Sequence, residues 1–228
     1  MIEQLLLARH GETPGNRNRV VQTPETPLSE TGRLQAGRLA RRVAELLGGR
    51  RLLVVSSDYR RARETAEIVA AGAGAEGSEA ERAQVELEPL LRERNFGQLR
   101  GQSYDDIARR QIDPFAVDYR PPGGDDWPTF DDRGGAAWRA LLHRVDAERA
   151  DERPALLLAV THGFVLRRLI GLHLRRDRGG APIEVPERWG NTSLTLVDGG
   201  APHPVLLLNC VAHLDSAVPV HPRAISGI

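Results

Sequence analysis

Two histidines in this chain share the same local setting. His10 and His162 each follow an apolar run, and each is followed by a glycine, Gly11 and Gly163. A neutral imidazole is a competent nucleophile, and a glycine lets backbone N–H groups come close to a bound group. Taken alone, either histidine is more simply explained as a buried core residue. Two matching units instead favour one site that binds and attacks an anion.

Arginine is the cation available to such a site. All 31 basic residues are arginine and lysine is absent, which excludes a P-loop lysine, a Schiff-base lysine and a lysine general base. A GC-rich genome explains this bias equally well. The guanidinium group binds a phosphoryl group through two parallel hydrogen bonds. Arginines beside the two histidines therefore predict a phosphoryl-binding site.

The composition narrows the class of protein. The chain has 228 residues, with 31 acidic residues balancing the 31 arginines, so nothing draws it to nucleic acid or to an anionic membrane. Its one cysteine permits no intrachain disulfide. The N-terminus lacks the pattern of a signal peptide, and no apolar run is long enough to span a bilayer. We expect a cytoplasmic protein without a membrane or nucleic-acid partner, for which a homodimer stays open.

Apolar strand patterns alternate with helical patterns along the chain. This alternation predicts one domain over residues 1–228, a three-layer α/β/α sandwich with a mostly parallel central sheet. The tail after about residue 214 is expected to be loosely held. Strands are expected at Gln4–Ala8, Leu52–Ser56, Val85–Leu87, Ala155–Thr161, Ser193–Val197 and Val205–Leu208. Helices are expected at Ser29–Leu47, Tyr59–Ala71, Ser103–Arg110, Thr129–Ala150 and Phe164–Leu174. Loops are expected at Gly72–Arg82 and Tyr119–Trp127, with an irregular segment at Glu88–Gly101.

The expected strands bring the chemical groups together. Sites in open α/β sheets collect beyond the carboxyl ends of the strands. His10 and His162 both follow such ends, and the strand at Leu52–Ser56 leads to a run that contains Arg61. The helix after His162 also directs the positive end of its dipole toward the same place.

In the residues around these strand ends the chain resembles the histidine phosphatase superfamily, also called the phosphoglycerate mutase-like family. The resemblance runs from about Leu5 to Leu214 in family order, and four ordered motifs are far more specific than a lone Arg-His-Gly. The four motifs are Leu7-Ala8-Arg9-His10-Gly11-Glu12-Thr13 with Asn16, Ser56 through Ala66, Leu91 through Gly97, and Thr161-His162-Gly163. Leu28-Ser29 with Gly32 and Gln35-Ala36, and Asn191-Thr192-Ser193, also fit the family.

The resemblance implies a role for each matching position. His10 becomes the phosphohistidine, and Glu93 protonates the leaving oxygen and then deprotonates the acceptor. The phosphoryl oxygens are held by Arg9, Arg61 and His162, with Gly11, Asn16 and Gly163 beside them. The resemblance implies neither a metal nor a cofactor, because arginines supply the positive charge.

Three of these positions have ordinary alternatives. Arg61 lies in a charged helical run, which is usually a solvated face, and only the register of the motif selects it over Arg60. Glu93 could be a surface ion-pair partner of a neighbouring arginine. Asn16 could merely cap a turn.

The reaction is the least determined feature. The segment after Gly101 is short and more acidic than basic, and the loop with Asp125 and Asp126 resembles the corresponding loop of family phosphatases, except that Asp126 replaces a serine. We therefore expect a broad small-molecule phosphomonoester hydrolase. A cofactor-dependent phosphoglycerate mutase is the alternative, and a non-catalytic phosphate-binding module is the third. The sequence leaves the substrate open, and it leaves open whether the aspartates of this loop bind magnesium or only shape it.

Overall fold

A single six-stranded sheet forms the centre of the molecule. The computed structural model describes residues 2–73, 83–147 and 155–215. The strand order is β3-β2-β4-β1-β5-β6. Strands β3, β2, β4 and β1 run parallel, β5 is antiparallel to β1, and β6 is antiparallel to β5. The strands are β1 (Ile2–Arg9), β2 (Arg51–Ser56), β3 (Val85–Leu87), β4 (Ala155–Thr161), β5 (Leu194–Asp198) and β6 (Val205–Cys210). The expected mostly parallel sheet is confirmed.

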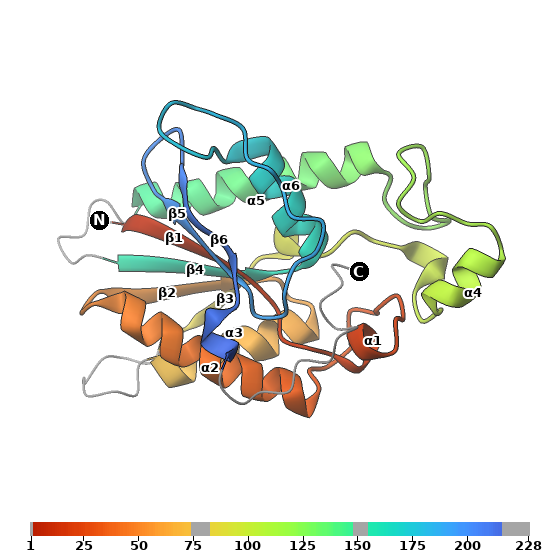
Figure 1. Cartoon of the computed structure of the whole chain (residues 1–228), viewed down its shortest axis with the longest axis horizontal. Coiled ribbons are helices and arrows are strands. Elements are labelled where there is room, and N and C mark those ends of the chain that lie inside the picture. The colour runs from red at the N-terminus through yellow and green to blue at the C-terminus, as the bar shows by residue number, and fades with distance from the viewer. Residues whose placement is uncertain (1, 74–82, 148–154, 216–228) are drawn as a thin grey trace.

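Helices cover both faces of this sheet, which gives the predicted three layers (Figure 1). Helices α2 and α3 pack together on one face, and α5 and α6 pack together on the other. The described helices are α1 (Pro14–Arg17), α2 (Glu30–Leu47), α3 (Arg60–Ala73), α4 (Tyr104–Arg109), α5 (Trp127–Ala147) and α6 (Gly163–His173). Short 3₁₀ turns lie at Pro89–Leu91, Gly97–Leu99 and Ala212–Leu214.

The central strands are apolar on both sides because both sides are covered. Along β1, Leu5 and Leu7 belong to the core under α5 and α6, whereas Leu6 and Ala8 belong to the core under α2 and α3. All seven residues of β4 are buried. This burial explains why the strands read as continuous apolar runs rather than as alternating ones.

Most element boundaries agree with the sequence predictions. Ser29 caps α2 through a hydrogen bond from the backbone N–H of Gly32, and Gly48 ends the helix in the left-handed conformation. Helix α3 continues through Ala73, two residues beyond the prediction. Helix α5 starts at Trp127, two residues before the predicted start, because Asp126 caps it with a bond of 2.9 Å from the N–H of Thr129.

Some predictions fall on residues that the structure does not describe, and some elements of the structure were not predicted. The predicted end of α5 at Ala150, most of the loop expected at 72–82, and the tail from residue 216 lie outside the described residues. Helix α1 was not predicted; it is one turn held by a capping box between Thr13 and Asn16. The stretch expected to be irregular at 88–101 contains two 3₁₀ turns. Among the described residues, no helix is long and apolar enough to cross a membrane.

Candidate active site

The two histidines lie side by side at the carboxyl ends of neighbouring parallel strands. Pairing of β1 with β4 sets Arg9 opposite Thr161, so His10 and His162 leave the sheet at the same level. Their ring centroids are 5.2 Å apart, and both side chains are buried. The spacing satisfies our expectation that both imidazoles can reach one phosphoryl group.

The His10 ring is oriented by its own loop. Its Nδ1 lies 2.7 Å from the carbonyl oxygen of Gly11, to which an Nδ1–H donates, and this assigns the lone pair to Nε2. The Arg61 Nε–H lies 3.2 Å from that Nε2 and donates to it. Burial first, and then the charges of Arg61 and Arg9, lower the pKa of His10 well below its usual value. The ring is therefore neutral near pH 7, with Nε2 facing the pocket.

The arginine run on α3 divides between the pocket and the surface. Arg61 is 2% exposed, while Arg60 pairs with Glu64 at 2.7 Å and Arg63 pairs with Glu67 on the outside. The Arg61 Nη1–H also donates to the carbonyl of Thr23 at 3.0 Å. The family motif selected Arg61 over Arg60, and Arg61 is the arginine that lies beside His10.

Arg9 is the second buried cation of the pocket. It is 2% exposed, and its Nη1–H donates to the carbonyl of Trp189. Burial lowers the pKa of both Arg9 and Arg61 to about 10. Both guanidinium groups therefore keep their charge at neutral pH, in a place where water screens them little.

His162 begins helix α6 as its N-cap residue, and Gly163 is the first residue of the helix. The His162 Nε2 lies 2.9 Å from the hydroxyl oxygen of Ser57, and its Nδ1 has no hydrogen-bond partner among the described residues. Burial is the largest cause that lowers the pKa of His162 well below its usual range, with Arg61 next. The His162 ring thus lies beside His10 at the N-terminal end of α6, although it is not part of the cavity lining that includes His10.

Glu93 faces the same pocket instead of the surface. Its carboxylate accepts the backbone N–H of Arg94 at 3.0 Å and that of Phe164 at 3.2 Å. The neighbouring arginines have other partners, because Arg92 pairs with Asp58 and Arg94 donates to three backbone carbonyls. Burial raises the pKa of Glu93, against the opposing effect of those backbone N–H groups. A carboxyl group of this kind is suited to deliver a proton.

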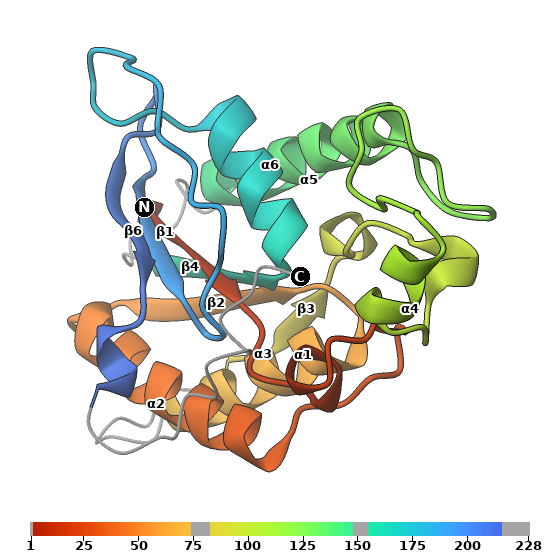
Figure 2. The ribbon, with the colours of Figure 1, turned by 45° about the vertical axis from the view of Figure 1, so that its right-hand side comes forward.

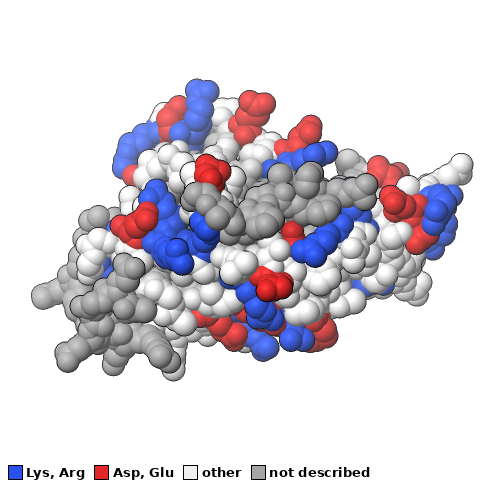
Figure 3. Space-filling view, turned by 60° about the horizontal axis from the view of Figure 1, so that its bottom comes forward, with Lys and Arg blue, Asp and Glu red and all other residues white. Residues whose placement is uncertain are grey.

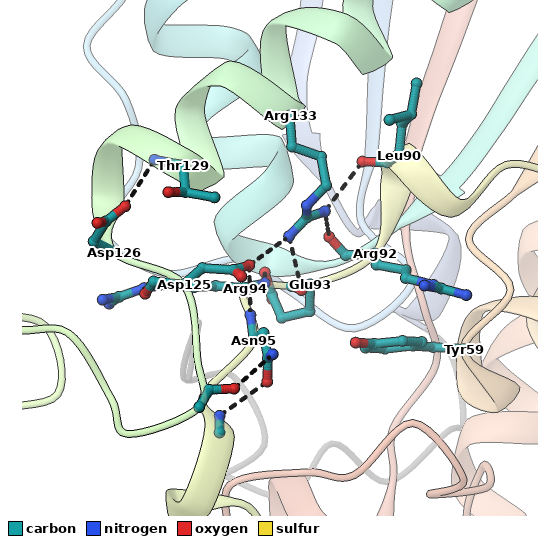
Figure 4. A network of polar contacts seen from close by, with 12 residues as sticks. Tyr59, Leu90, Arg92, Glu93, Arg94, Asn95, Asp125, Asp126, Thr129 and Arg133 are labelled. Carbon is teal, nitrogen blue, oxygen red and sulfur yellow. Dashed lines mark hydrogen bonds and ion pairs between the residues drawn. The ribbon is translucent and has the colours of Figure 1, made fainter.

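Arg133 of α5 holds the backbone around Glu93 (Figure 4). It donates to the carbonyl of Glu93 at 3.1 Å, and also to those of Leu90 and Arg92. It pairs with Asp125 at 3.1 Å, and the same Asp125 oxygen accepts the N–H of Asn95 at 3.1 Å. The Asp125–Asp126 loop therefore has a structural task here: Asp125 ties the Glu93 segment to α5, while Asp126 caps that helix.

Gly11 and Asn16 lie behind the pocket. The Gly11 N–H donates to the Thr65 hydroxyl at 3.0 Å, and a Cβ on Gly11 would lie 2.6 Å from the carbonyl oxygen of Gly32. The Asn16 side-chain oxygen serves the capping box by accepting the Thr13 N–H, which agrees with the turn-capping alternative. Its buried Nδ2 group has no hydrogen-bond partner among the described residues, so none of them uses its N–H donors.

The pocket between these groups is a small cavity of about 30 Å³. Beyond the predicted site residues, eight side chains contribute to its walls. Tyr59, Arg94 and Phe96 lie within the motifs but had no role assigned to them, and the other five lie outside the motifs: Val20, Val21, Gln22, Tyr104 of α4 and Phe164 of α6. Most of this added lining is apolar or aromatic. Among the described residues, no group of three or more His, Cys, Asp or Glu side chains is arranged to hold a metal ion.

Charged side chains of both signs are mixed on one face of the molecule. On the face shown in Figure 3, acidic and basic side chains are interspersed and neither sign forms an extended field. Arg9 and Arg61, in contrast, are two buried cations in one pocket.

A mixed α/β/α sandwich with two histidines at the ends of adjacent parallel strands is the phosphoglycerate mutase-like fold. The chain belongs to the histidine phosphatase superfamily (branch 1), whose family model matches residues 5–210. Members of this superfamily are phosphatases and mutases, so the family is one of enzymes.

Known relatives carry both kinds of name. The chain is 33% identical over 204 residues to a probable phosphoglycerate mutase GpmB of Cronobacter sakazakii (strain ATCC BAA-894), covering 86% of this chain and 84% of that protein. Bacillus stearothermophilus YhfR is 28% identical, with a TM-score of 0.71 over 94% of this chain and all of that one. A mycobacterial glucosyl-3-phosphoglycerate phosphatase, solved with VO3, is 26% identical with a TM-score of 0.67, over 91% and 99% of the two chains.

Proposed function

We propose that this protein is a metal-independent phosphomonoester hydrolase of broad small-molecule specificity, acting through a phosphohistidine on His10. One observation carries the proposal: the neutral His10 Nε2 faces a cavity that also holds Arg61 and Glu93. A nucleophile, a cation for the phosphoryl oxygens and a carboxyl acid are the three groups that such a reaction needs.

The first half-reaction transfers the phosphoryl group to the enzyme. The phosphoryl oxygens take over the Arg61 Nε–H that His10 Nε2 accepts in the free protein. The freed lone pair of Nε2 attacks phosphorus, the N–P bond forms and the bond from phosphorus to the leaving oxygen breaks. Glu93 gives its proton to that oxygen, so the product is a neutral alcohol and Glu93 becomes a carboxylate. Arg9, Arg61 and His162 stabilise the phosphoryl oxygens, typically by about 3 kcal/mol for each well-placed donor.

The second half-reaction returns the enzyme to its starting state. The Glu93 carboxylate takes a proton from water while the water oxygen attacks phosphorus. The N–P bond breaks, its electron pair returns to His10 Nε2, and inorganic phosphate leaves. Glu93 is then protonated again and His10 is neutral, so protons and electrons balance over the cycle.

The cation content of the cavity supports hydrolysis over mutase activity. A mutase must hold a bisphosphate, which calls for cations beyond those on the first phosphoryl group. The cavity lining holds Arg9, Arg61 and Arg94 as its cations, and Arg94 has all three guanidinium nitrogens committed to backbone carbonyls. The remaining lining side chains bring no positive charge for a second phosphate.

The deciding experiment compares phosphate release with isomer exchange. The protein is supplied with 3-phosphoglycerate and catalytic 2,3-bisphosphoglycerate, and both products are measured over time. We expect hydrolysis to dominate. Exchange faster than hydrolysis by about a hundredfold, equivalent to about 3 kcal/mol in favour of the alcohol acceptor, would overturn the hydrolase proposal in favour of the mutase.

The intermediate is tested by His10→Ala. We expect this variant to lose essentially all activity and the acid-labile phosphoprotein that labelled substrate forms in the wild type after rapid quenching. His143→Ala is the matched control, because His143 lies exposed on α5. Labelling that persists in His10→Ala would remove His10 from the nucleophile role.

A further inference from the structure

A second and much larger cavity adjoins the small one. It has a volume of about 570 Å³, within the usual range for sites that bind small organic molecules. The start of α5 and the segment from Phe115 to Val117 form one side, and the segment with Trp189 forms the other, with the first turns of α6 between them. Figure 2 shows the segment before α5 and the segment between α6 and β5 on opposite sides of α6.

The walls of this cavity are aromatic. Phe115, Trp127, Phe164 and Trp189 line it, and Phe164 stacks on Phe115 with ring centroids 5.4 Å apart. Val117 lies at the rim with 88% of its surface exposed. Flat walls of this kind suit a planar or branched apolar group, since burying apolar surface drives binding.

Phe164 connects the two cavities. The residue is part of the lining of both, and its backbone N–H donates to the Glu93 carboxylate at 3.2 Å. The leaving oxygen of a substrate must come within hydrogen-bond reach of Glu93 to receive a proton. It therefore lies beside Phe164, at the junction of the cavities. The small cavity of about 30 Å³ has no room for an alcohol body beside a phosphoryl group, so the rest of a larger alcohol has to extend past Phe164.

Trp189, which lines the large cavity, carries a buried polar group that lacks a partner in the described part of the chain. Trp189 is 1% exposed, and its indole Nε1–H has no hydrogen-bond partner among the described residues. Its backbone carbonyl meanwhile accepts from Arg9, so this residue links the phosphoryl site to the large cavity. A buried donor without a partner is costly, and an acceptor on a ligand would remove that cost.

Charges around the cavity balance. Arg168 forms a two-fold ion pair with Asp131, and exposed Arg167 is matched in number by exposed Glu187. The rim therefore offers no excess of positive charge to a second phosphate. An uncharged group fits these surroundings better than a phosphorylated one.

We propose that the large cavity binds the alcohol part of the substrate, and that the preferred substrates are phosphomonoesters of aromatic or branched apolar alcohols with a hydrogen-bond acceptor for Trp189. The inference rests on the proposed hydrolase function and deepens it by naming a substrate class. The phosphoryl group occupies the small cavity, the leaving oxygen lies at Glu93, and the apolar body lies between Phe115 and Trp189.

Three substrates separate the parts of this proposal. Acetyl phosphate fits the small cavity alone, 2-naphthyl phosphate adds a fused aromatic body, and 4-methylumbelliferyl phosphate adds a body of similar size with a carbonyl acceptor. We expect Val117→Asp to lower the ratio of kcat/KM for 2-naphthyl phosphate over acetyl phosphate about tenfold, because it sets a charge at the apolar rim. Leu206→Asp is the control, since Leu206 lies 54% exposed on β6, away from this cavity.

Trp189→Phe tests the hydrogen bond, because it keeps an aromatic ring and removes the donor. We expect it to lower kcat/KM for 4-methylumbelliferyl phosphate about tenfold relative to 2-naphthyl phosphate. Unchanged ratios in both variants, or an equal change in Leu206→Asp, would overturn the proposal.

A binding measurement separates this proposal from the hydrolase proposal. The alcohol 4-methylumbelliferone is titrated into the protein with inorganic phosphate present, and its fluorescence is followed. Saturable binding that Val117→Asp weakens supports the large cavity as its site even if no phosphomonoester is hydrolysed. Absence of binding to the wild-type protein overturns the cavity assignment while leaving phosphohistidine formation to be judged by trapping.

Discussion

Within α3, one position along the chain separates a surface ion pair from a buried pocket cation. Successive residues of a helix point about 100° apart, so Arg60 turns to Glu64 at the surface while Arg61 turns inward to His10. Glu93 shows the same selectivity, since both adjacent arginines find partners elsewhere. Arg61 and Glu93 differ from their neighbours in the direction of their side chains. Because these side chains point into the buried pocket, their pKa values are shifted.

Glu93→Gln tests the acid at the residue scale. Because a general acid matters most when the leaving alkoxide is strongly basic, we expect turnover of an alkyl phosphate to fall about 10² to 10⁴-fold. Turnover of p-nitrophenyl phosphate should fall far less. An equal loss on both substrates would assign Glu93 to binding or to structure.

The pH profile of the same variant gives a second measure. The first half-reaction needs Glu93 protonated and His10 neutral. Burial raises the pKa of Glu93 and lowers that of His10, so activity should fall on the alkaline side as Glu93 ionises above its ordinary value. On the acid side it should fall only well below pH 6.5, the ordinary pKa of histidine. We expect Glu93→Gln to lose the alkaline limb and to keep the acid one.

At the scale of elements, the site depends on how closely α2 approaches the loop after β1. A Cβ on Gly32 would lie 2.1 Å from the carbonyl oxygen of Glu12, and a Cβ on Gly11 would meet Gly32. Ser29, the cap of α2, also donates to the Glu12 carboxylate at 2.8 Å. The first turn of α2 therefore acts as the back wall of the loop that carries His10.

Gly32→Ala should destabilise the fold by about 1–3 kcal/mol, the usual cost of overpacking. Gly37→Ala, in the same helix, is the matched control, because a Cβ there meets no atom within 4 Å. Removing that glycine should stabilise the helix by up to about 1 kcal/mol. Urea unfolding of both variants measures the difference, and equal midpoints would contradict the close-approach argument.

Helix α5 positions the acid through Arg133. Arg133→Met keeps the length of the side chain but removes the donors to the carbonyl of Glu93 and the pair with Asp125. We expect turnover of alkyl phosphates to fall about tenfold more than turnover of p-nitrophenyl phosphate, because a misplaced Glu93 protonates poorly. Arg139→Met, on the exposed side of α5, should change neither. A uniform loss on all substrates would indicate a purely structural role.

At the scale of the whole molecule, two neutral histidines are buried in one place. Their folded pKa values lie well below the ordinary 6.5, so the unfolded chain binds more protons below that pH. The stability they contribute is present above about pH 6.5 and declines as the pH falls. Glu93 has the opposite effect on the pH dependence of stability. Because burial raises its folded pKa above the ordinary 4.5, the stability that it contributes declines as the pH rises above that value.

We therefore expect His162→Gln to flatten the loss of stability between pH 6.5 and 5 by up to about 1.4 kcal/mol per pH unit. Urea unfolding at several pH values gives the slope. His143→Gln, an exposed histidine on α5, should leave the slope unchanged. A slope that does not change in His162→Gln would mean that His162 titrates normally in the folded protein.

The sequence by itself determined the sheet, the helices that cover it and the group of residues that meet at its edge. Apolar runs define β1 and β4, and because parallel strands end at the same edge of a sheet, the sequence placed His10 and His162 at one edge. That β1 and β4 are direct neighbours came from the structure. Ser29 and Gly48 likewise fixed the ends of α2, since caps act through local backbone geometry.

Only the tertiary structure decided which side chains complete the pocket and what surrounds it. Tyr104 of α4 and Phe164 of α6 join the cavity through the packing of their helices, which no local pattern encodes. The partners of Arg133 and Asp125 lie up to 43 residues away along the chain, so the support of Glu93 could not be read from its neighbours. The depressed pKa of His10 and the unpartnered indole of Trp189 are consequences of burial, and burial depends on the whole fold.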